Sequence, residues 1–178
     1  MKKTNDLLFM ELRDKQMADN LLWFIEKYYP NKKIIVSTST YHITRNVKEV
    51  TPERKQITDT KPMGQYIWDK HKDDIYSIAF VVYAGRTAKT SYRDKPICKK
   101  NKKSIEAMLH KANFKYTFLD LKSESKTKDG AWLGDKFIMS PTFRRCNLVA
   151  KWKEMYDGIF YIDKEFPNGK RIMDINTE

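Results

Sequence analysis

The sequence has little cysteine and lacks both long apolar runs and the common motif of serine hydrolases. Its two cysteines, Cys98 and Cys146, lie far apart without C-x-x-C spacing, which favours a reduced cytoplasmic protein without a disulfide framework. No apolar run has the length of a membrane span or of a signal peptide, so no membrane association is expected. No G-x-S-x-G elbow is present, and Ser37 and Ser39 are therefore not expected to act as nucleophiles.

The composition is that of a folded protein. The 178 residues are 40% hydrophobic and 13% aromatic, which predicts a single domain over residues 1–178 with a sizeable core. The formal net charge is +12, and residues 86–103 carry eight basic residues against one acidic residue, a local excess of +7. Such a cluster raises the question of an anionic partner.

Helical and strand-like patterns alternate along the chain. Met17, Leu21, Ile25 and Tyr28 recur at helical spacing within a helix expected over residues 5–29, which Pro30 ends. Two further helices are expected at 63–71 and 104–112, the second with Ser104 as its N-cap. Apolar runs predict strands over residues 33–38, 75–85, 115–121 and 157–163, and the first of these is expected to be buried on both faces. A weaker element is expected over residues 145–152. This order predicts an α/β fold with a mixed, largely parallel sheet flanked by helices.

Loops are expected to connect these elements. Residues 47–62 lack a period and contain two prolines, and residues 86–103 form an exposed basic connection. Residues 122–145 are rich in turn formers, with Trp132, Leu133 and Phe137 expected to point inward.

His42 is the leading candidate for chemistry. It lies six residues after Val36, at the end of a predicted strand, and α/β proteins form ligand sites beyond the carboxyl ends of their strands. An imidazole there can transfer protons near neutral pH, and Arg45 could bind a carboxylate or an oxyanion. The alternative is that His42 only caps the strand end by bonding a backbone carbonyl. His71 and His110 are expected to be solvated surface residues.

A longer pattern resembles the erythromycin esterase family. Residues 13–46, RDKQMADNLLWFIEKYYPNKKIIVSTSTYHITRN, match that family's R-D-x-x-M-A-x-N-L-x-W helix, its K-I-(I/V)-V strand and a motif close to H-N-x-H-I. The resemblance continues with Met63-Gly64 at the start of a helix, with the strand IYSIAFVVYAG and with YDGIFYID near the end. It covers most of the chain.

The resemblance implies hydrolysis of an ester or macrolide lactone without a metal or other cofactor, in which a histidine activates water. His42 matches the second histidine of the H-N-x-H motif and is the expected catalytic residue. Arg13 matches the arginine at the head of the helix. Ser39 replaces the first histidine, and a hydroxyl cannot carry a proton at neutral pH as an imidazole does. Arg13, Ser39 and Arg45 are the expected substrate-binding residues.

Family members are considerably longer, with a further catalytic histidine and acidic partners in their amino-terminal half. The chain is therefore expected to be the carboxy-terminal portion of such a hydrolase, weak or inactive alone. Its expected partners are a small-molecule ester or macrolide lactone, and either the missing amino-terminal half or a second copy.

A non-enzymatic basic domain that binds nucleic acid or a partner chain is the alternative. Only Tyr92 interleaves with the charges of residues 86–103, and no nucleic-acid-binding motif is present, so nucleic acid is not favoured as a partner.

Overall fold

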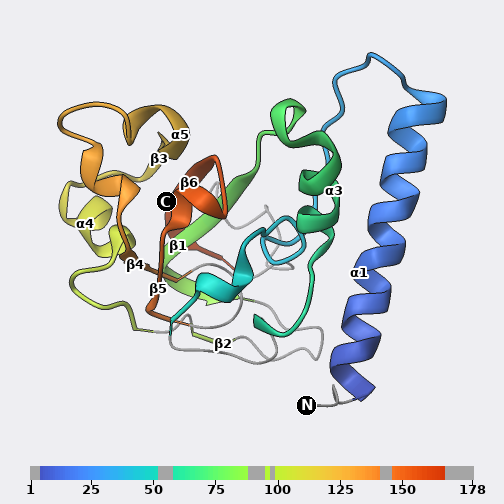
Figure 1. The fold of residues 1–178 in the computed structure, drawn as a ribbon. Coiled ribbons are helices and arrows are strands. Elements are labelled where there is room, and N and C mark those ends of the chain that lie inside the picture. Colours follow the sequence, from blue (N-terminus) through green and yellow to red (C-terminus); the bar gives the residue numbers. More distant parts are fainter. Residues whose placement is uncertain (1–4, 52–57, 88–94, 97–98, 141–145, 167–178) are drawn as a thin grey trace, which may run out of the picture.

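The computed structural model describes residues 5–51, 58–87, 95–96, 99–140 and 146–166. Figure 1 shows a long helix, α1, standing at one side of the molecule, with α3 between it and the strands. The helices and turns have the bounds α1 Asn5–Trp23, a π-helical turn Phe24–Tyr28, α3 Met63–His71, α4 Ile105–Lys111, α5 Leu121–Glu124, and short 3-10 turns at Val47–Glu49, Lys72–Asp74, Ala131–Gly134 and Trp152–Glu154. The strands are β1 Ile78–Thr87, β2 Lys95–Pro96, β3 Tyr116–Asp120, β4 Phe137–Met139, β5 Leu148–Ala150 and β6 Gly158–Glu165.

The α1 helix packs against the rest of the protein through a narrow stripe of buried side chains. Its buried residues, at helical spacing, are Leu7, Asp14, Ala18 and Leu22. Ala18 and Leu22 pack against Met63 and Ile67 of α3 in a small apolar cluster. The helix predicted over residues 5–29 is therefore confirmed, with its last turn widened to a π-helix before Pro30.

The main sheet is mixed, as predicted, with the strand order β2-β1-β6-β3. Within the described part of this sheet, β1 and β6 pair in parallel, whereas β2 and β3 run antiparallel to their neighbours. A separate two-stranded sheet pairs β4 with β5. The helices predicted at 63–71 and 104–112 are confirmed, and the Ser104 side chain caps α4 by accepting a hydrogen bond from the Ala107 N–H.

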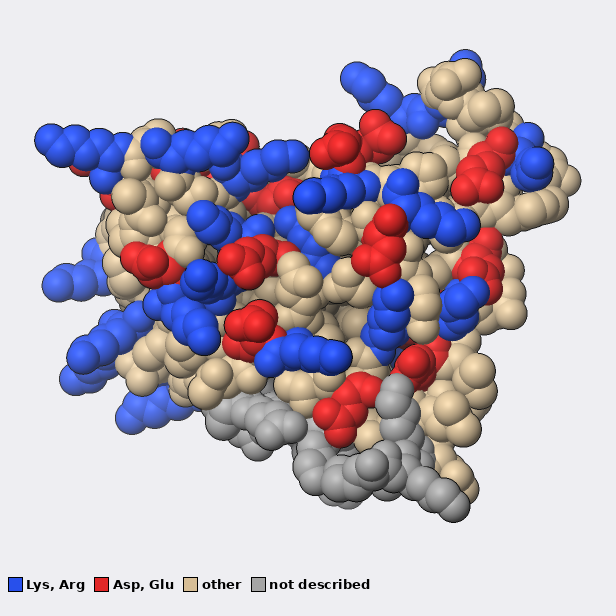
Figure 2. Space-filling model, viewed as in Figure 1, with Lys and Arg blue, Asp and Glu red and all other residues tan. Residues whose placement is uncertain are grey.

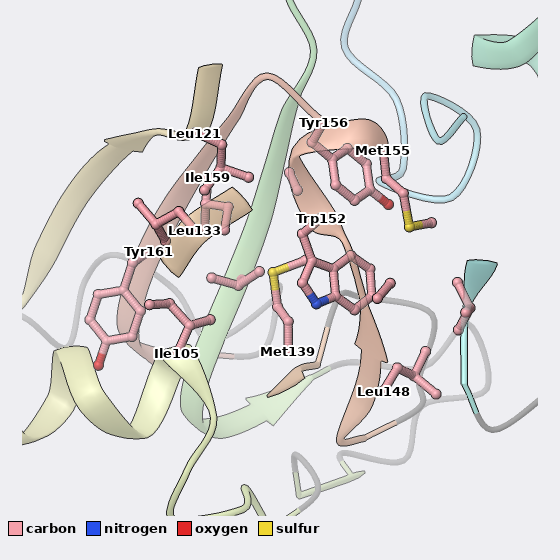
Figure 3. Packing of buried hydrophobic residues seen from close by; sticks show 14 of the residues in the cluster. Ile105, Leu121, Leu133, Met139, Leu148, Trp152, Met155, Tyr156, Ile159 and Tyr161 are labelled. Carbon is pink, nitrogen blue, oxygen red and sulfur yellow. The ribbon is translucent and has the colours of Figure 1, made fainter. Parts of the chain in front are cut away.

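The main apolar core lies on one face of the sheet. Trp152 is fully buried at its centre, and its indole N–H donates to the Phe137 carbonyl oxygen at 2.7 Å. Figure 3 shows side chains from α4, α5, β4, β5 and β6 gathered around this tryptophan. Leu133 is buried here as predicted and Phe137 is partly buried, whereas Trp132 is 40% exposed, so the inward placement predicted for Trp132 is wrong.

The opposite face of the sheet is apolar and open. Phe80, Phe160 and Phe118 occupy one row across three neighbouring strands, because Phe80 pairs with Phe160 and Phe160 pairs with Phe118. Phe80 is 49% and Phe118 47% exposed. Parallel strands are normally covered on both faces, so this row is an uncovered part of the fold.

The strand predicted over residues 33–38 is wrong. These residues have no regular secondary structure, and Ile35 is 97% exposed. Among the residues that the structure describes, the backbone of 33–38 finds no hydrogen-bond partner. A β-branched apolar run forms a strand only where another strand pairs with it, and none does so here.

Cysteine usage also differs from expectation. Cys146 is disulfide-bonded, so the prediction of a protein without disulfides is wrong. Cys98, the other cysteine, lies outside the described residues. The cytoplasmic location was inferred from reduced cysteines, and the disulfide bond removes that argument. The location therefore stays a prediction. None of the helices in the described part of the chain has the length and apolar character needed to cross a bilayer.

Candidate functional site

The turn 40–46, TYHITRN, is fixed on the side of the main core by two threonines. Thr40 and Thr44 are buried, and the Thr44 hydroxyl donates to the Thr40 carbonyl oxygen at 2.8 Å. The Tyr156 hydroxyl, at the edge of the core, hydrogen-bonds the Thr44 hydroxyl. The turn closes at Asn46, whose backbone is left-handed (φ 53°), a conformation that asparagine tolerates. These bonds hold the turn firmly against the sheet.

Arg45 is buried, and the structure corrects its predicted substrate-binding role. Its guanidinium forms a two-pronged ion pair with Asp157, with both N–O distances at 3.0 Å. The other donors bond the Ser77 hydroxyl and the carbonyl oxygens of Glu154 and Lys153, so all five N–H groups have acceptors within the protein. The guanidinium also stacks on the Trp68 ring at 3.8 Å, and no donor is left for a substrate.

His42 turns to the other side of the same segment, toward α1. Its Nδ1 lies 2.9 Å from Asp14 Oδ1 and 3.0 Å from Oδ2, and the N–H direction fits a hydrogen bond to Oδ2. The Asp14 side chain is 1% exposed and the His42 side chain 17% exposed. A carboxylate that accepts from Nδ1–H fixes the tautomer in which Nε2 carries no proton. The ring therefore pairs with a carboxylate, and not with a backbone carbonyl as the alternative from the sequence supposed.

The backbone around His42 is held by the start of α3. The Gly64 N–H donates to the His42 carbonyl oxygen at 2.6 Å, and the Met63 N–H donates to Asp14 Oδ2 at 3.2 Å. A Cβ on Gly64 would lie 2.3 Å from the Ile43 carbonyl carbon, so only glycine permits this close approach. The Met63-Gly64 pair thus places both members of the Asp14–His42 couple.

Arg13 and Ser39 are the other predicted substrate-binding residues. The Arg13 guanidinium is 3.6 Å from Asp14 Oδ1 and its side chain is 45% exposed, so it lies beside the couple and reaches solvent. Ser39 is exposed, and its carbonyl oxygen accepts from the His42 N–H. The Tyr41 ring packs edge-on against the imidazole, and burial raises the pKa of the Tyr41 hydroxyl although a hydrogen bond with Thr60 opposes this.

An open apolar groove lies next to the couple. Its lining is Met17, Asn20, Leu21, Trp23, Phe24, Val36, Ser37, Thr38 and Met63. His42 is not part of this lining, and Met63 links the two places, because its backbone N–H donates to Asp14. Within the described ranges, no three His, Cys, Asp or Glu side chains are grouped to hold a metal ion.

The remaining histidines and the basic segment lie elsewhere. His71 is 3.7 Å from Glu26 and its side chain is 27% exposed, so it is more enclosed than expected. His110 is 48% exposed and pairs with Asp163 at 2.7 Å, near the surface as expected. Much of the basic segment 86–103 lies outside the described residues. Figure 2 shows acidic side chains interspersed among the basic ones on the face it presents. Burial lowers the pKa of the Lys100 ammonium, an effect that the nearby Glu106 carboxylate opposes.

Asp14 is the site residue that sequence reasoning missed. Its sequence signal was its position in the stripe of α1 with Leu7, Ala18 and Leu22, where an acidic residue would be buried. A buried carboxylate requires a partner, and a histidine was the available candidate.

Comparison with known proteins gives a consistent match. The family model described as "Erythromycin esterase" matches residues 2–165. The Bacillus subtilis protein YbfO, named as a candidate hydrolase, is 26% identical over 161 residues, which is 88% of this chain and 35% of YbfO. The chain therefore spans about a third of the length of this curated relative.

Solved structures share the fold. A protein described as a succinoglycan biosynthesis protein superposes with a TM-score of 0.72 at 18% identity, over 92% of this chain and 41% of its own. A Bacillus cereus protein gives a TM-score of 0.67 at 17% identity, again over 92% and 41%. A histidine-to-asparagine variant of the erythromycin esterase EreC, in its open conformation, gives 0.59 at 18% identity over 86% and 37%. Each neighbour contains more polypeptide than this chain supplies.

Proposed function

Because the chain belongs to the erythromycin esterase family, we propose that it is the carboxy-terminal portion of an ester hydrolase whose general base is His42. The observation that carries the proposal is the Asp14–His42 couple, with its carboxylate 1% exposed and its imidazole reaching solvent. The substrate class is a carboxylic ester, including the macrolide lactone that the family's name indicates. Arg13 and Ser39 are the proposed substrate-binding residues beside it.

The chemistry follows from the tautomer. Nε2 of His42 takes a proton from water while the water oxygen attacks the ester carbonyl carbon, and the imidazolium that forms is stabilised by Asp14. Collapse of the tetrahedral intermediate breaks the carbon–oxygen ester bond, and Nε2 returns the proton to the departing alkoxide. Acid and alcohol are the products, and the histidine is regenerated. The exposed Arg13 guanidinium is placed to bind the carboxylate product or the oxyanion.

The opposing wall of the site belongs, in this proposal, to the amino-terminal half of the family's fold. Three observations support that division. The groove beside the couple is open, the Phe80–Phe160–Phe118 row is uncovered, and the relatives with this fold are more than twice as long. An ester oxyanion needs donors fixed on the far side of the carbonyl, whereas Arg13 lies on the same side as the couple, 3.6 Å from Asp14 Oδ1. Activity of the chain alone is therefore expected to be weak or absent.

The test uses a chimera in which this chain replaces the matching 161-residue region of YbfO. Hydrolysis of p-nitrophenyl acetate and of erythromycin is measured for the chain alone and for the chimera. The chimera is expected to hydrolyse an ester, and His42→Gln is expected to lower kcat about 100- to 10,000-fold because the base is lost. Asp14→Asn is expected to lower kcat as well, since an amide N–H facing Nδ1 favours the tautomer with a proton on Nε2.

The matched control is His110→Gln. His110 has the same pairing with a carboxylate, but on α4 and β6, so this variant should leave hydrolysis unchanged. A chimera that folds but hydrolyses neither ester, or that loses nothing in His42→Gln, would refute the proposed reaction. Strong turnover by the chain alone that disappears in His42→Ala would refute the need for the amino-terminal half.

A further inference from the structure

The open face of the main sheet is apolar across β1, β6 and β3. Side chains alternate between the two faces of a strand. Ile159 and Tyr161 of β6 therefore point into the core (Figure 3), and Phe160 between them points to the open face. The residues paired with β6 extend this face into two neighbouring rows: Phe118, Phe160 and Phe80, then Tyr116, Ile162 and Val82. The Tyr76 ring lies beside the first row, 6.4 Å from the Phe118 ring, and completes what we call the aromatic face.

The aromatic face leaves enough surface exposed for a small interface. Phe80, Phe118, Tyr76 and Tyr116 are 49%, 47%, 45% and 64% exposed. An aromatic side chain buries about 150–250 Å² when it is fully covered, so each of these still has about 100 Å² to lose. Two copies packed face to face would bury about 800–1,000 Å² in total, at the lower limit for a specific complex. The face can therefore support a weak dimer.

One acidic and one basic side chain lie at opposite ends of the aromatic face. Asp120 follows Phe118 by two residues on β3 and pairs with Gly158, where β6 begins. Lys164 is exposed and pairs with Ala84 near the other end of β6. Both lie an even number of residues from the phenylalanine row along their own strands, which puts them on the same side of the sheet. The face therefore has an acidic end and a basic end, with the two uncharged rows between them.

This pattern is complementary to its own copy turned end for end. A two-fold axis parallel to the sheet and perpendicular to the strands reverses the strand direction in the second copy. It lays the phenylalanine row of each copy on the Tyr116–Ile162–Val82 row of the other, and it sets each acidic end against a basic end. The net charge of +12 opposes association of two copies in general, but the two ends of this face carry opposite charges.

We propose that the aromatic face is a homodimer interface of this chain, in which two copies pack sheet to sheet with reversed strand direction and Asp120 of each copy pairs with Lys164 of the other. Packed sheets lie about 10 Å apart, a spacing that side chains from both faces fill. In the proposed function the amino-terminal half covers the same Phe80–Phe160–Phe118 row, so the dimer is a state of the chain without that half. The inference does not depend on hydrolysis, and its test measures mass and not turnover.

Sedimentation velocity of the chain alone, over about 1–200 μM, measures the association. The mass is expected to rise from 21.2 kDa toward twice that value, with a dissociation constant in the micromolar range because the interface is small. A monomer at every concentration would overturn the inference. A mass that passes the dimer without stopping would overturn it as well, because a two-fold interface closes at two copies.

Replacements on and off the aromatic face locate the contact. Phe80→Lys should weaken the dimer about 30-fold or more, because it places an ammonium among the apolar rows. The matched control is Phe9→Lys, the same replacement at a 67% exposed position on α1, which should leave association unchanged. Tyr116→Lys, at a 64% exposed position, repeats the test where Phe80→Lys fails to fold. Equal weakening by the Phe9 control, or no weakening by a folded replacement on the face, contradicts the inference.

Two charge variants test the orientation of the copies. Lys164→Glu should weaken association about 10-fold, because it sets two carboxylates together at each end of the interface. In an Asp120→Asn background the same change should have less than about a threefold effect. Asparagine can keep the cap of α5, which Asp120 supplies by accepting from the Ser123 N–H. Equal effects of Lys164→Glu in both backgrounds would show that the two charges do not meet, and the proposed packing would be wrong.

Discussion

The replacement Asp157→Asn tests the structural role assigned to Arg45. Asp157 is 3% exposed, and besides the guanidinium its carboxylate accepts from the Ser77 N–H and hydroxyl. Asparagine keeps one oxygen acceptor but removes the charge and turns an amide N–H toward Arg45. Breaking a buried ion pair from one side costs about 3–5 kcal/mol, because the remaining charge stays buried and unpaired. At about 2–4 °C per kcal/mol for a chain of this size, Tm should fall by roughly 6–20 °C.

Urea unfolding followed by tryptophan fluorescence measures this loss, since Trp152 is fully buried. The control, Asp163→Asn, breaks the exposed pair with His110 and should cost at most about 1 kcal/mol. Arg45→Lys should destabilise too, because an ammonium cannot supply five donors or the stacking on Trp68. A free energy of unfolding for Asp157→Asn within 1 kcal/mol of the wild type would refute the assignment, and Arg45 would again be available for substrate.

The pH dependence gives an independent check of the same pair. Burial alone would raise the pKa of the Asp157 carboxyl, but the hydrogen bonds from Arg45 and Ser77 hold it below its usual range. An aspartate with a lowered folded-state pKa contributes stability above its unfolded pKa of about 3.9, and that contribution is lost as pH falls through the folded value. The gap between wild type and Asp157→Asn should therefore be constant from pH 5 to 7 and shrink below about pH 4.

Gly64→Ala tests the backbone packing beside the site, and Glu106→Gln tests a buried carboxyl group of the core. Gly64→Ala should cost about 1–3 kcal/mol and lower hydrolysis by the chimera, because its Cβ would meet the Ile43 backbone. Gly134→Ala, whose Cβ would approach only the flexible Lys153 side chain, is the control, and equal effects of the two variants would contradict the argument. Burial raises the pKa of Glu106, whose Oε2 finds no hydrogen-bond partner within the described part of the chain. Its charged form is therefore disfavoured in the folded protein, and urea unfolding should show Glu106→Gln gaining stability relative to wild type as pH rises above about 4.3; a gap independent of pH would contradict this.

Local patterns predicted the elements that depend on nearby residues. The 5–29 helix followed from side chains three and four apart, and the Ser104 cap from the contact between a side chain and a backbone N–H three residues on. The final strand followed from a continuous apolar run, and its centre at Ile159 and Tyr161 is fully buried. Each of these depends on interactions that lie close together in the sequence.

The misplaced features depend on partners distant in sequence. Arg45 is 112 residues from Asp157, so no local pattern could show that its guanidinium was already paired. Ile34, Ile35 and Val36 have strand propensity, but a strand exists only where a second backbone pairs with it. His42 was recognised from its place after an apolar run, whereas Asp14, 28 residues away on α1, emerged only when the helix was packed.

The turn 40–46 explains why a histidine is placed there. Thr44 and Arg45 are bonded to Tyr156 and Asp157 beside the sheet, while His42 is bonded to Asp14 on α1 and, through its carbonyl oxygen, to Gly64 on α3. The turn therefore joins the sheet to the helical pair. The donors of the Arg45 guanidinium are all bonded within the protein, whereas His42 Nε2 has no hydrogen-bond partner among the described residues. An imidazole with a fixed tautomer, on a backbone held from both sides, has little conformational freedom to lose, and the general-base role proposed for His42 requires such preorganisation.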